Sequence, residues 1–118
     1  MGDGNQSKSY IHVSDVVAAV LHAGRYSPGY YDIYNVATGD YITVTEIAEL
    51  AVECLELPIQ PRLDYIGGDR GWKGDVPIVR LNTERICRLG WRCSHSTREA
   101  LRMSLLALIK DARAGLLQ

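Results

Sequence analysis

Two short motifs determine where two helices of this chain begin. In each motif a Ser or Thr is followed three residues later by a Glu, and the two side chains satisfy free backbone N–H groups at a helix start. The first pair is Thr43 with Glu46, and the second is Ser96 with Glu99. Apolar residues at helical spacing follow both pairs. The sequence therefore predicts one helix that starts after Thr43 and ends before Pro58, and another that starts after Ser96.

Weaker signals predict two further helices. Ser14 is the expected cap of a helix with Val16, Val17, Val20 and Leu21 at helical spacing, ending at Gly24. Asn82 or Thr83 is the expected cap of a short helix that is stopped by Gly90. Four helices in all are predicted.

Short strands are expected between these helices. Met1–Lys8 is polar and Gly-rich, which is typical of a frayed terminus. Runs rich in β-forming or alternating residues predict strands at Tyr10–Val13, Asp32–Val36, Pro61–Ile66 and Ile78–Leu81. The expected fold is a small mixed α/β domain of about four helices and three or four short strands, forming a single unit over residues 1–118.

The stretch Gly67–Pro77, reading GGDRGWKGDVP, is dense in glycine. Loops keep such glycines where the backbone needs a positive φ or passes close to another group. Arg70 and Lys73 beside this backbone suit a phosphate, and Asp75 suits a hydroxyl. A surface turn with solvated charges explains the same residues equally well.

Composition excludes several classes of function. The net charge is −1, and the cations are dispersed, so we expect no nucleic-acid partner. The three cysteines and three histidines lack metal-ligand spacing, so no metal site is expected. No apolar run approaches the roughly 18 residues of a membrane span. The expected protein is soluble and cytoplasmic, with reduced thiols.

Four motifs resemble a known family. Gly2–Asp15, reading GDGNQSKSYIHVSD, is similar to the loop, strand and helix that begin the C-terminal part of extended short-chain dehydrogenase/reductases, where the pattern runs G-x-G-x-Q-x-R-D-Y-I-H-V-x-D. The other three are Tyr34–Gly39 followed by Thr43–Leu50, the pair Gly90-Trp91, and Ser96–Ala100. They occur in the order found in UDP-glucose 4-epimerase-like members. The chain thus resembles the C-terminal, substrate-binding region of an NAD-dependent epimerase/dehydratase, a lobe without its Rossmann half.

The resemblance implies roles for four residues. In the family, a basic residue before the Tyr-Ile-His strand contacts the substrate diphosphate, and Lys8 stands there in place of the commoner Arg. Lys keeps the charge but lacks the bidentate fork of Arg. In the family's second loop, an Arg grips the diphosphate and an Asp holds the ribose. Asp75 matches that Asp, whereas either Arg70 or Lys73 could match the Arg. Tyr10, His12 and Asp15 match structural positions of the first motif.

The catalytic residues of the family are not found in this sequence. Its chemistry uses an NAD-binding glycine motif and a Tyr-x-x-x-Lys pair, and none of the seven tyrosines is followed by Lys at the fourth position. We therefore expect no catalytic residue here. We expect a nucleotide-sugar-binding lobe, with a UDP-sugar as its ligand, that is inactive alone. The alternative is a non-catalytic interaction module that self-associates through the surface facing the missing Rossmann domain. The expected protein partners are further copies of the chain in a homo-oligomer, or a separate chain that carries the Rossmann domain.

Overall fold

The structure, a computed structural model, describes residues 4–65, 67 and 79–116. It confirms a small mixed α/β fold, with four helices and one two-stranded sheet in the described residues. In chain order the elements are β1 (Ser7–Lys8), α1 (Val13–Tyr26), β2 (Ile42–Thr43), α2 (Val44–Leu55), α3 (Glu84–Arg88) and α4 (Thr97–Arg113). Of the glycine-dense stretch, Gly67 alone is described.

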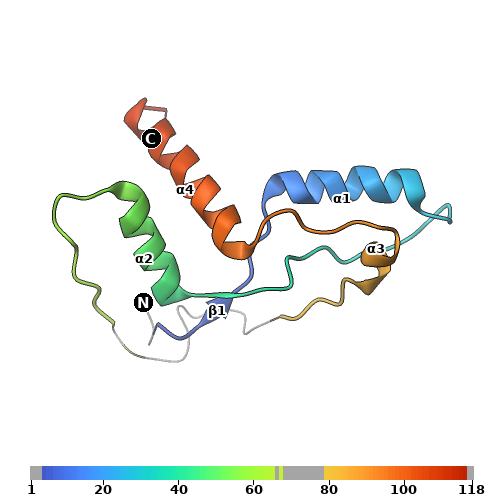
Figure 1. The fold of residues 1–118 in the computed structure, drawn as a ribbon, viewed down its shortest axis with the longest axis horizontal. Helices are drawn as coiled ribbons and strands as arrows, with labels where there is room; N and C mark the ends of the chain where they lie inside the picture. The colour runs from blue at the N-terminus through green and yellow to red at the C-terminus, as the bar shows by residue number, and fades with distance from the viewer. Residues whose placement is uncertain (1–3, 66, 68–78, 117–118) are drawn as a thin grey trace.

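Both predicted capping boxes are confirmed. The Glu46 side chain accepts the backbone N–H of Thr43 at 2.8 Å, and the Glu99 side chain accepts that of Ser96 at 2.7 Å. The two helices that they start, α2 and α4, pack side by side at one end of the molecule (Figure 1). The α2 residues Leu50 and Cys54 are buried there, so the apolar stripe read from the sequence does form a core.

The α1 helix differs from the prediction at both ends. Its cap is His12, whose Nδ1 accepts the backbone N–H of Ser14 at 3.3 Å, so the predicted cap Ser14 lies inside the first turn. The helix also continues past Gly24 to Tyr26, because a glycine inside a helix costs only about 1 kcal/mol and need not end it.

The strands lie elsewhere than predicted. Among the described residues the one sheet pairs Ser7 with Thr43 and Lys8 with Ile42 in antiparallel register, so the terminus predicted to fray is partly ordered. None of the described residues in the four predicted strands belongs to a strand. A strand needs a neighbour that supplies its ladder. Here side chains satisfy the extended backbone instead, as where Arg85 donates to the carbonyl of Ile33 at 2.9 Å.

The described elements spread out rather than closing around one core. The radius of gyration is 17.3 Å, against roughly 13.5 Å for a compact domain of this length. One small core lies between α2 and α4, and a second gathers Ala19, Ile86 and Trp91. The two ends are linked by long extended segments (Figure 1).

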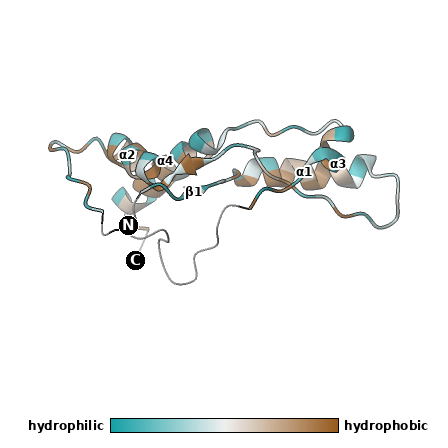
Figure 2. Ribbon diagram, turned by 90° about the horizontal axis from the view of Figure 1, so that it is seen from below, coloured by the Kyte–Doolittle hydropathy of each residue, from teal (hydrophilic) through white to brown (hydrophobic). Residues whose placement is uncertain are grey.

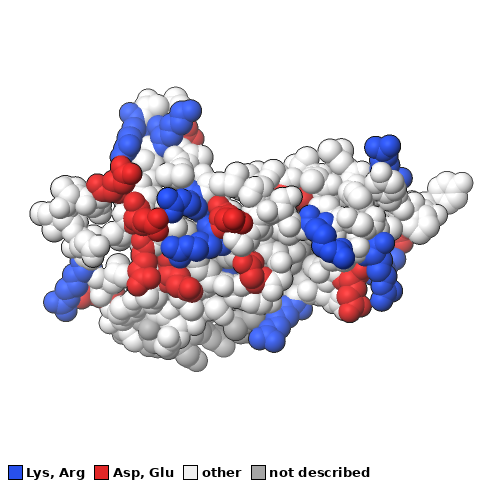
Figure 3. All heavy atoms as spheres, in the orientation of Figure 1, with Lys and Arg blue, Asp and Glu red and all other residues white. Residues whose placement is uncertain are grey.

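One side of α1 is apolar and uncovered. Val13, Val17, Val20 and Leu21 are between 51% and 69% exposed, while the buried residues of this helix are Asp15 and Ala19. The α1 ribbon carries hydrophobic colour along part of its length (Figure 2). The space-filling view also shows few charges along most of this helix (Figure 3). The apolar positions read from the sequence are real, but most of them face outward.

Candidate functional site

A hollow of about 340 Å³ lies beside the short sheet. Three segments form its walls: residues 7–11, residues 36–41 and residues 79–81. Most of the lining is apolar, and Lys8 supplies a cation. We call it the β1 cavity. Its volume is at the lower end of the roughly 300–1,000 Å³ found for small-molecule sites, and its mixture of apolar walls with few polar groups is typical of them.

The sheet register positions Lys8 in this wall. Lys8 pairs with Ile42, which is 3% exposed and fixes the strand from the core side. The strand is further fastened at the start of α2, where the carbonyl of Gln6 accepts the N–H of Val44 at 2.9 Å. That bond also satisfies one of the free N–H groups of the helix start. Lys8 therefore projects from a backbone that is held on both sides.

Thr97 ties two walls of the β1 cavity to the start of α4. Its side chain is fully buried, and its hydroxyl donates to the carbonyl of Tyr10 and contacts the hydroxyl of Thr38 at 3.0 Å. The Asp40 carboxylate accepts the N–H of Thr97 at 3.0 and 3.1 Å. Burial raises the pKa of Asp40, but hydrogen bonds from Thr38 and Thr97 outweigh it and lower the pKa below its ordinary value. Asp40 thus stays ionised at a helix N-terminus, where a negative charge is stabilising.

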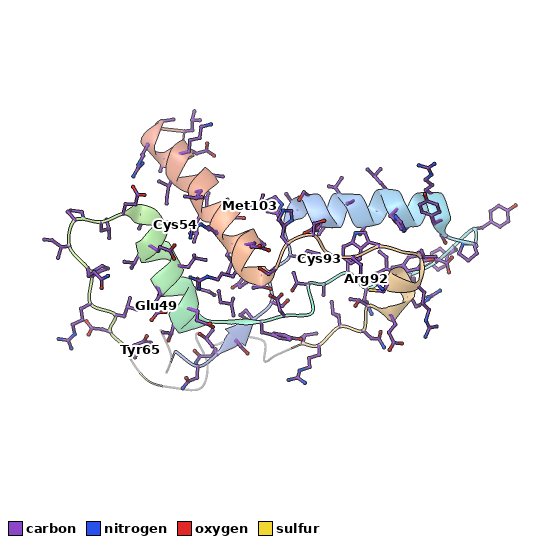
Figure 4. All side chains as sticks on the ribbon, viewed as in Figure 1. Glu49, Cys54, Tyr65, Arg92, Cys93 and Met103 are labelled. Atoms are coloured by element: carbon purple, nitrogen blue, oxygen red, sulfur yellow. The ribbon has the colours of Figure 1, made fainter. Side chains whose placement is uncertain are left out.

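The segments on either side of the undescribed stretch are both fastened near the sheet. Before it, the Tyr65 hydroxyl contacts the hydroxyl of Thr45 at 3.0 Å, beside the N-terminal end of α2 (Figure 4). After it, the Tyr41 hydroxyl donates to the carbonyl of Val79 at 3.5 Å. Gly4 lies under the Tyr65 ring with a φ of +84°, and a Cβ at this position would collide with Tyr65 and Thr45. This close approach is one that glycine alone permits.

A second polar cluster lies away from the β1 cavity. Asp15 is 2% exposed and accepts the backbone N–H groups of Ser94 and His95, the ring of His95 at 2.9 Å, and the thiol of Cys93. Figure 4 shows Cys93 in the segment that passes from α3 to α4 below α1. Burial raises the pKa of Asp15, but these hydrogen bonds together hold it well below its ordinary range.

The Asp15 cluster is structural rather than reactive. Burial and the neighbouring Asp15 carboxylate raise the pKa of the Cys93 thiol, which makes it a poor nucleophile. The cluster joins the first turn of α1 to the segment before α4. In the described residues no group of three or more His, Cys, Asp or Glu side chains is arranged to hold a metal ion.

The chain is similar to known proteins in sequence and in fold. No protein-family model matches it. The dTDP-4-dehydro-6-deoxy-D-allose reductase of Streptomyces bikiniensis is 38% identical over 63 residues, which are 53% of this chain and 19% of that protein. The UDP-glucose 4-epimerase of Thermotoga maritima, solved with UDP-glucose, superposes with a TM-score of 0.72 and 29% identity, covering 95% of this chain and 34% of that one.

A second solved epimerase has a similar fold. The UDP-glucose 4-epimerase of Thermus thermophilus, solved with NAD, gives a TM-score of 0.65 at 25% identity, covering 88% of this chain and 31% of that one. The chain resembles nucleotide-sugar epimerases, dehydratases and reductases in sequence and fold. Its fold matches a part of two solved UDP-sugar 4-epimerases, with 91% and 95% of this chain covered. It spans about a fifth of the curated relative and about a third of the solved structures.

The family's cofactor does not fit the residues described here. A dinucleotide needs a glycine-rich turn between a strand and a helix, with the pyrophosphate at the helix N-terminus. In the described part of the chain, β2 leads directly into the capping box of α2, and those helix N–H groups are taken by Gln6, Gly4 and Thr43. Separately, no described helix is both long and apolar enough to cross a membrane.

The structure describes one of the four predicted site residues. Lys8 lies in the wall of the β1 cavity. Arg70, Lys73 and Asp75 lie outside the described residues, so their roles stay predictions. Sequence reasoning missed Tyr41, which lines the same cavity. Its position directly before β2 is the signal that was available, but only the sheet register shows which wall it joins.

Proposed function

We propose that this chain is the nucleotide-sugar-binding portion of an NAD-dependent sugar epimerase or dehydratase, a single truncated substrate-binding domain over residues 1–118. The observation that carries the proposal is the β1 cavity, where Lys8 stands beside apolar walls. It is supported by the likeness to an epimerase solved with UDP-glucose. A UDP-sugar is the ligand that we infer for this chain.

The ligand's chemistry matches the residues as follows. Lys8 contacts the diphosphate as a point charge, and either Arg70 or Lys73 contacts it from the glycine-dense stretch. Asp75 accepts hydrogen bonds from the ribose hydroxyls. The apolar walls cover one ring of the ligand, since a cavity of about 340 Å³ holds part of a nucleotide sugar rather than all of it.

Binding and chemistry are separate expectations. In the whole enzyme of this family NAD takes up and returns a hydride, but the residues present here bind and orient. We therefore expect saturable binding of UDP-glucose and no turnover. Calorimetric titration of the chain with UDP-glucose tests the binding. Replacing Lys8 with Gln should weaken it about fivefold, the upper end for an exposed charge pair. The control Lys110→Gln, at the end of α4, should leave it unchanged.

Two results would contradict this proposal. If the unaltered chain binds no UDP-glucose at millimolar concentration, that result contradicts the binding role. Turnover of UDP-glucose with added NAD, by chain freed of host enzymes, contradicts the expected lack of activity.

The uncovered face of α1 favours a second candidate, a non-catalytic module that self-associates. Val13, Val17, Val20 and Leu21 form an apolar stripe with no charged neighbour between them, and proteins rarely leave such stripes in contact with water. A second copy of the chain could cover it. Light scattering at micromolar concentration distinguishes the two candidates: a dimer that binds no UDP-glucose supports the module, and a monomer contradicts it.

A further inference from the structure

A cation with no assigned role stands at the edge of the β1 cavity. Val79 and Leu81 both line the cavity, and Arg80 lies between them in the chain. None of the sequence motifs that resemble the epimerase family includes Arg80. Its side chain is exposed.

Tyr41 holds the guanidinium of Arg80 at this edge. The Cζ of Arg80 lies 5.9 Å from the centroid of the Tyr41 ring, within the distance at which an aromatic face attracts a cation. Tyr41 is itself part of the cavity wall, and its hydroxyl donates to the carbonyl of Val79. The two contacts link Arg80, through Tyr41, to the wall of the hollow.

Arg80 also differs from most arginines of the described chain in what it pairs with. Five of them form ion pairs with carboxylates: Arg62 with Asp64, Arg85 with Asp32, Arg88 with Glu84, and both Arg98 and Arg102 with Glu53. Within the described residues no carboxylate pairs with Arg80. The planar guanidinium carries paired N–H donors that match the oxygens of a phosphate.

We propose that Arg80 is a second cation of the β1 cavity and binds the diphosphate of the ligand together with Lys8. The inference rests on the proposed function and names a residue that it does not include. Lys8 lines the cavity from the sheet, and Arg80 lies at the cavity edge, against the ring of Tyr41. A diphosphate carries anionic oxygens on two phosphorus atoms, so it can meet both cations at once. Arg80 supplies the paired donors that Lys8 lacks.

The test compares ligands that differ only in phosphate. Uridine, UMP and UDP are titrated into the unaltered chain and into Arg80→Gln, Arg80→Lys and Arg88→Gln. Arg88 is the matched control, because it is an exposed arginine on α3 that is paired with Glu84. We expect Arg80→Gln to weaken UDP binding about fivefold, UMP less, and uridine not at all. Arg80→Lys should recover part of the loss, and Arg88→Gln should stay within twofold of the unaltered chain.

The outcomes separate this inference from the function beneath it. Unaltered chain that binds no UDP contradicts the proposed function and removes the basis for Arg80. If Arg80→Gln binds UDP as tightly as the unaltered chain does, that result contradicts the Arg80 inference alone. An equal loss for uridine and UDP also overturns it, because Arg80 would then act by holding Tyr41 and not by binding phosphate.

Discussion

Replacing Asp15 with Asn should unfold the chain at a much lower concentration of urea. The carboxylate of Asp15 is 2% exposed and accepts two backbone N–H groups and the His95 ring. Asn keeps the size of the side chain but replaces one acceptor oxygen by an NH₂ group, which faces a donor. The substitution therefore tests the hydrogen bonds and the charge without opening a cavity.

The expected loss follows from these contacts. A hydrogen bond to a charged group contributes about 1.5–3 kcal/mol, and a buried donor left without an acceptor costs about 1–3 kcal/mol. The Ser94 N–H can keep the remaining oxygen, whereas the backbone or ring N–H of His95 loses its acceptor. We expect the free energy of unfolding to fall by about 2–4 kcal/mol. That is a large share of the roughly 5–15 kcal/mol available to a small protein.

Urea denaturation followed by circular dichroism measures this change. With a slope of about 1–3 kcal/mol per molar urea, the midpoint should fall by about 0.7–4 M. Asp64→Asn is the control, since Asp64 is exposed and pairs with the exposed Arg62. Its effect should stay below about 1 kcal/mol. Equal midpoints for Asp15→Asn and Asp64→Asn would refute the reasoning that the Asp15 cluster joins α1 to the segment before α4.

Three further predictions follow from the same contacts. Hydrogen bonds hold the pKa of Asp15 below its ordinary value of 3.8. The contribution of Asp15 to stability is therefore complete above pH 3.8 and is lost as the pH falls below it. Acid unfolding of Asp15→Asn should depend less on pH than that of the unaltered chain. Thr97→Val removes the buried hydroxyl that connects the cavity walls and should cost about 1–3 kcal/mol by chemical denaturation, with Thr97→Ser restoring most of it. Gly4→Ala should destabilise the chain more than Gly67→Ala. Both glycines have a positive φ, but the new Cβ would collide with Tyr65 only at Gly4. Equal melting temperatures for the two variants would contradict this prediction.

Sequence reasoning predicted the helices well because their signals are local. Thr43 with Glu46, and Ser96 with Glu99, are complete within four residues, and both act in the structure as the pattern indicates. The cap of α1 was assigned wrongly to Ser14, because His12 is an uncommon cap whose ring nitrogen takes the place of an oxygen. The amino-acid sequence alone does not show that the ring turns back toward the helix.

The strands could not be placed from the sequence, because pairing is not local. Tyr10–Val13 and Asp32–Val36 have the composition of strands, yet side chains from distant segments satisfy their backbone. Conversely, Ser7–Lys8 looked like a loose terminus and is paired with Ile42–Thr43, which lies 34 positions or more away in the chain. The same pairing brings Lys8 to the β1 cavity. The cavity wall could therefore not be predicted from the sequence, for the same reason as the sheet.

The candidate site contains one residue that was named from the sequence, and its binding role stays a prediction. Lys8 was named from a family motif, and the structure puts it in the wall of a hollow. Tyr41 and Arg80 carry no such motif. Tyr41 lines the cavity, and Arg80 contacts the Tyr41 ring from 39 positions away in the chain, a contact that exists only when the chain is folded.

The central claim is that the β1 cavity binds a nucleotide sugar. It is tested most directly by recording amide NMR spectra of the chain as UDP-glucose is added. We predict saturable shifts of the amides of Lys8, Gly39 and Tyr41, with those of α1 unchanged. Saturable shifts confined to residues outside the cavity walls, or no shifts at millimolar UDP-glucose, would contradict the claim.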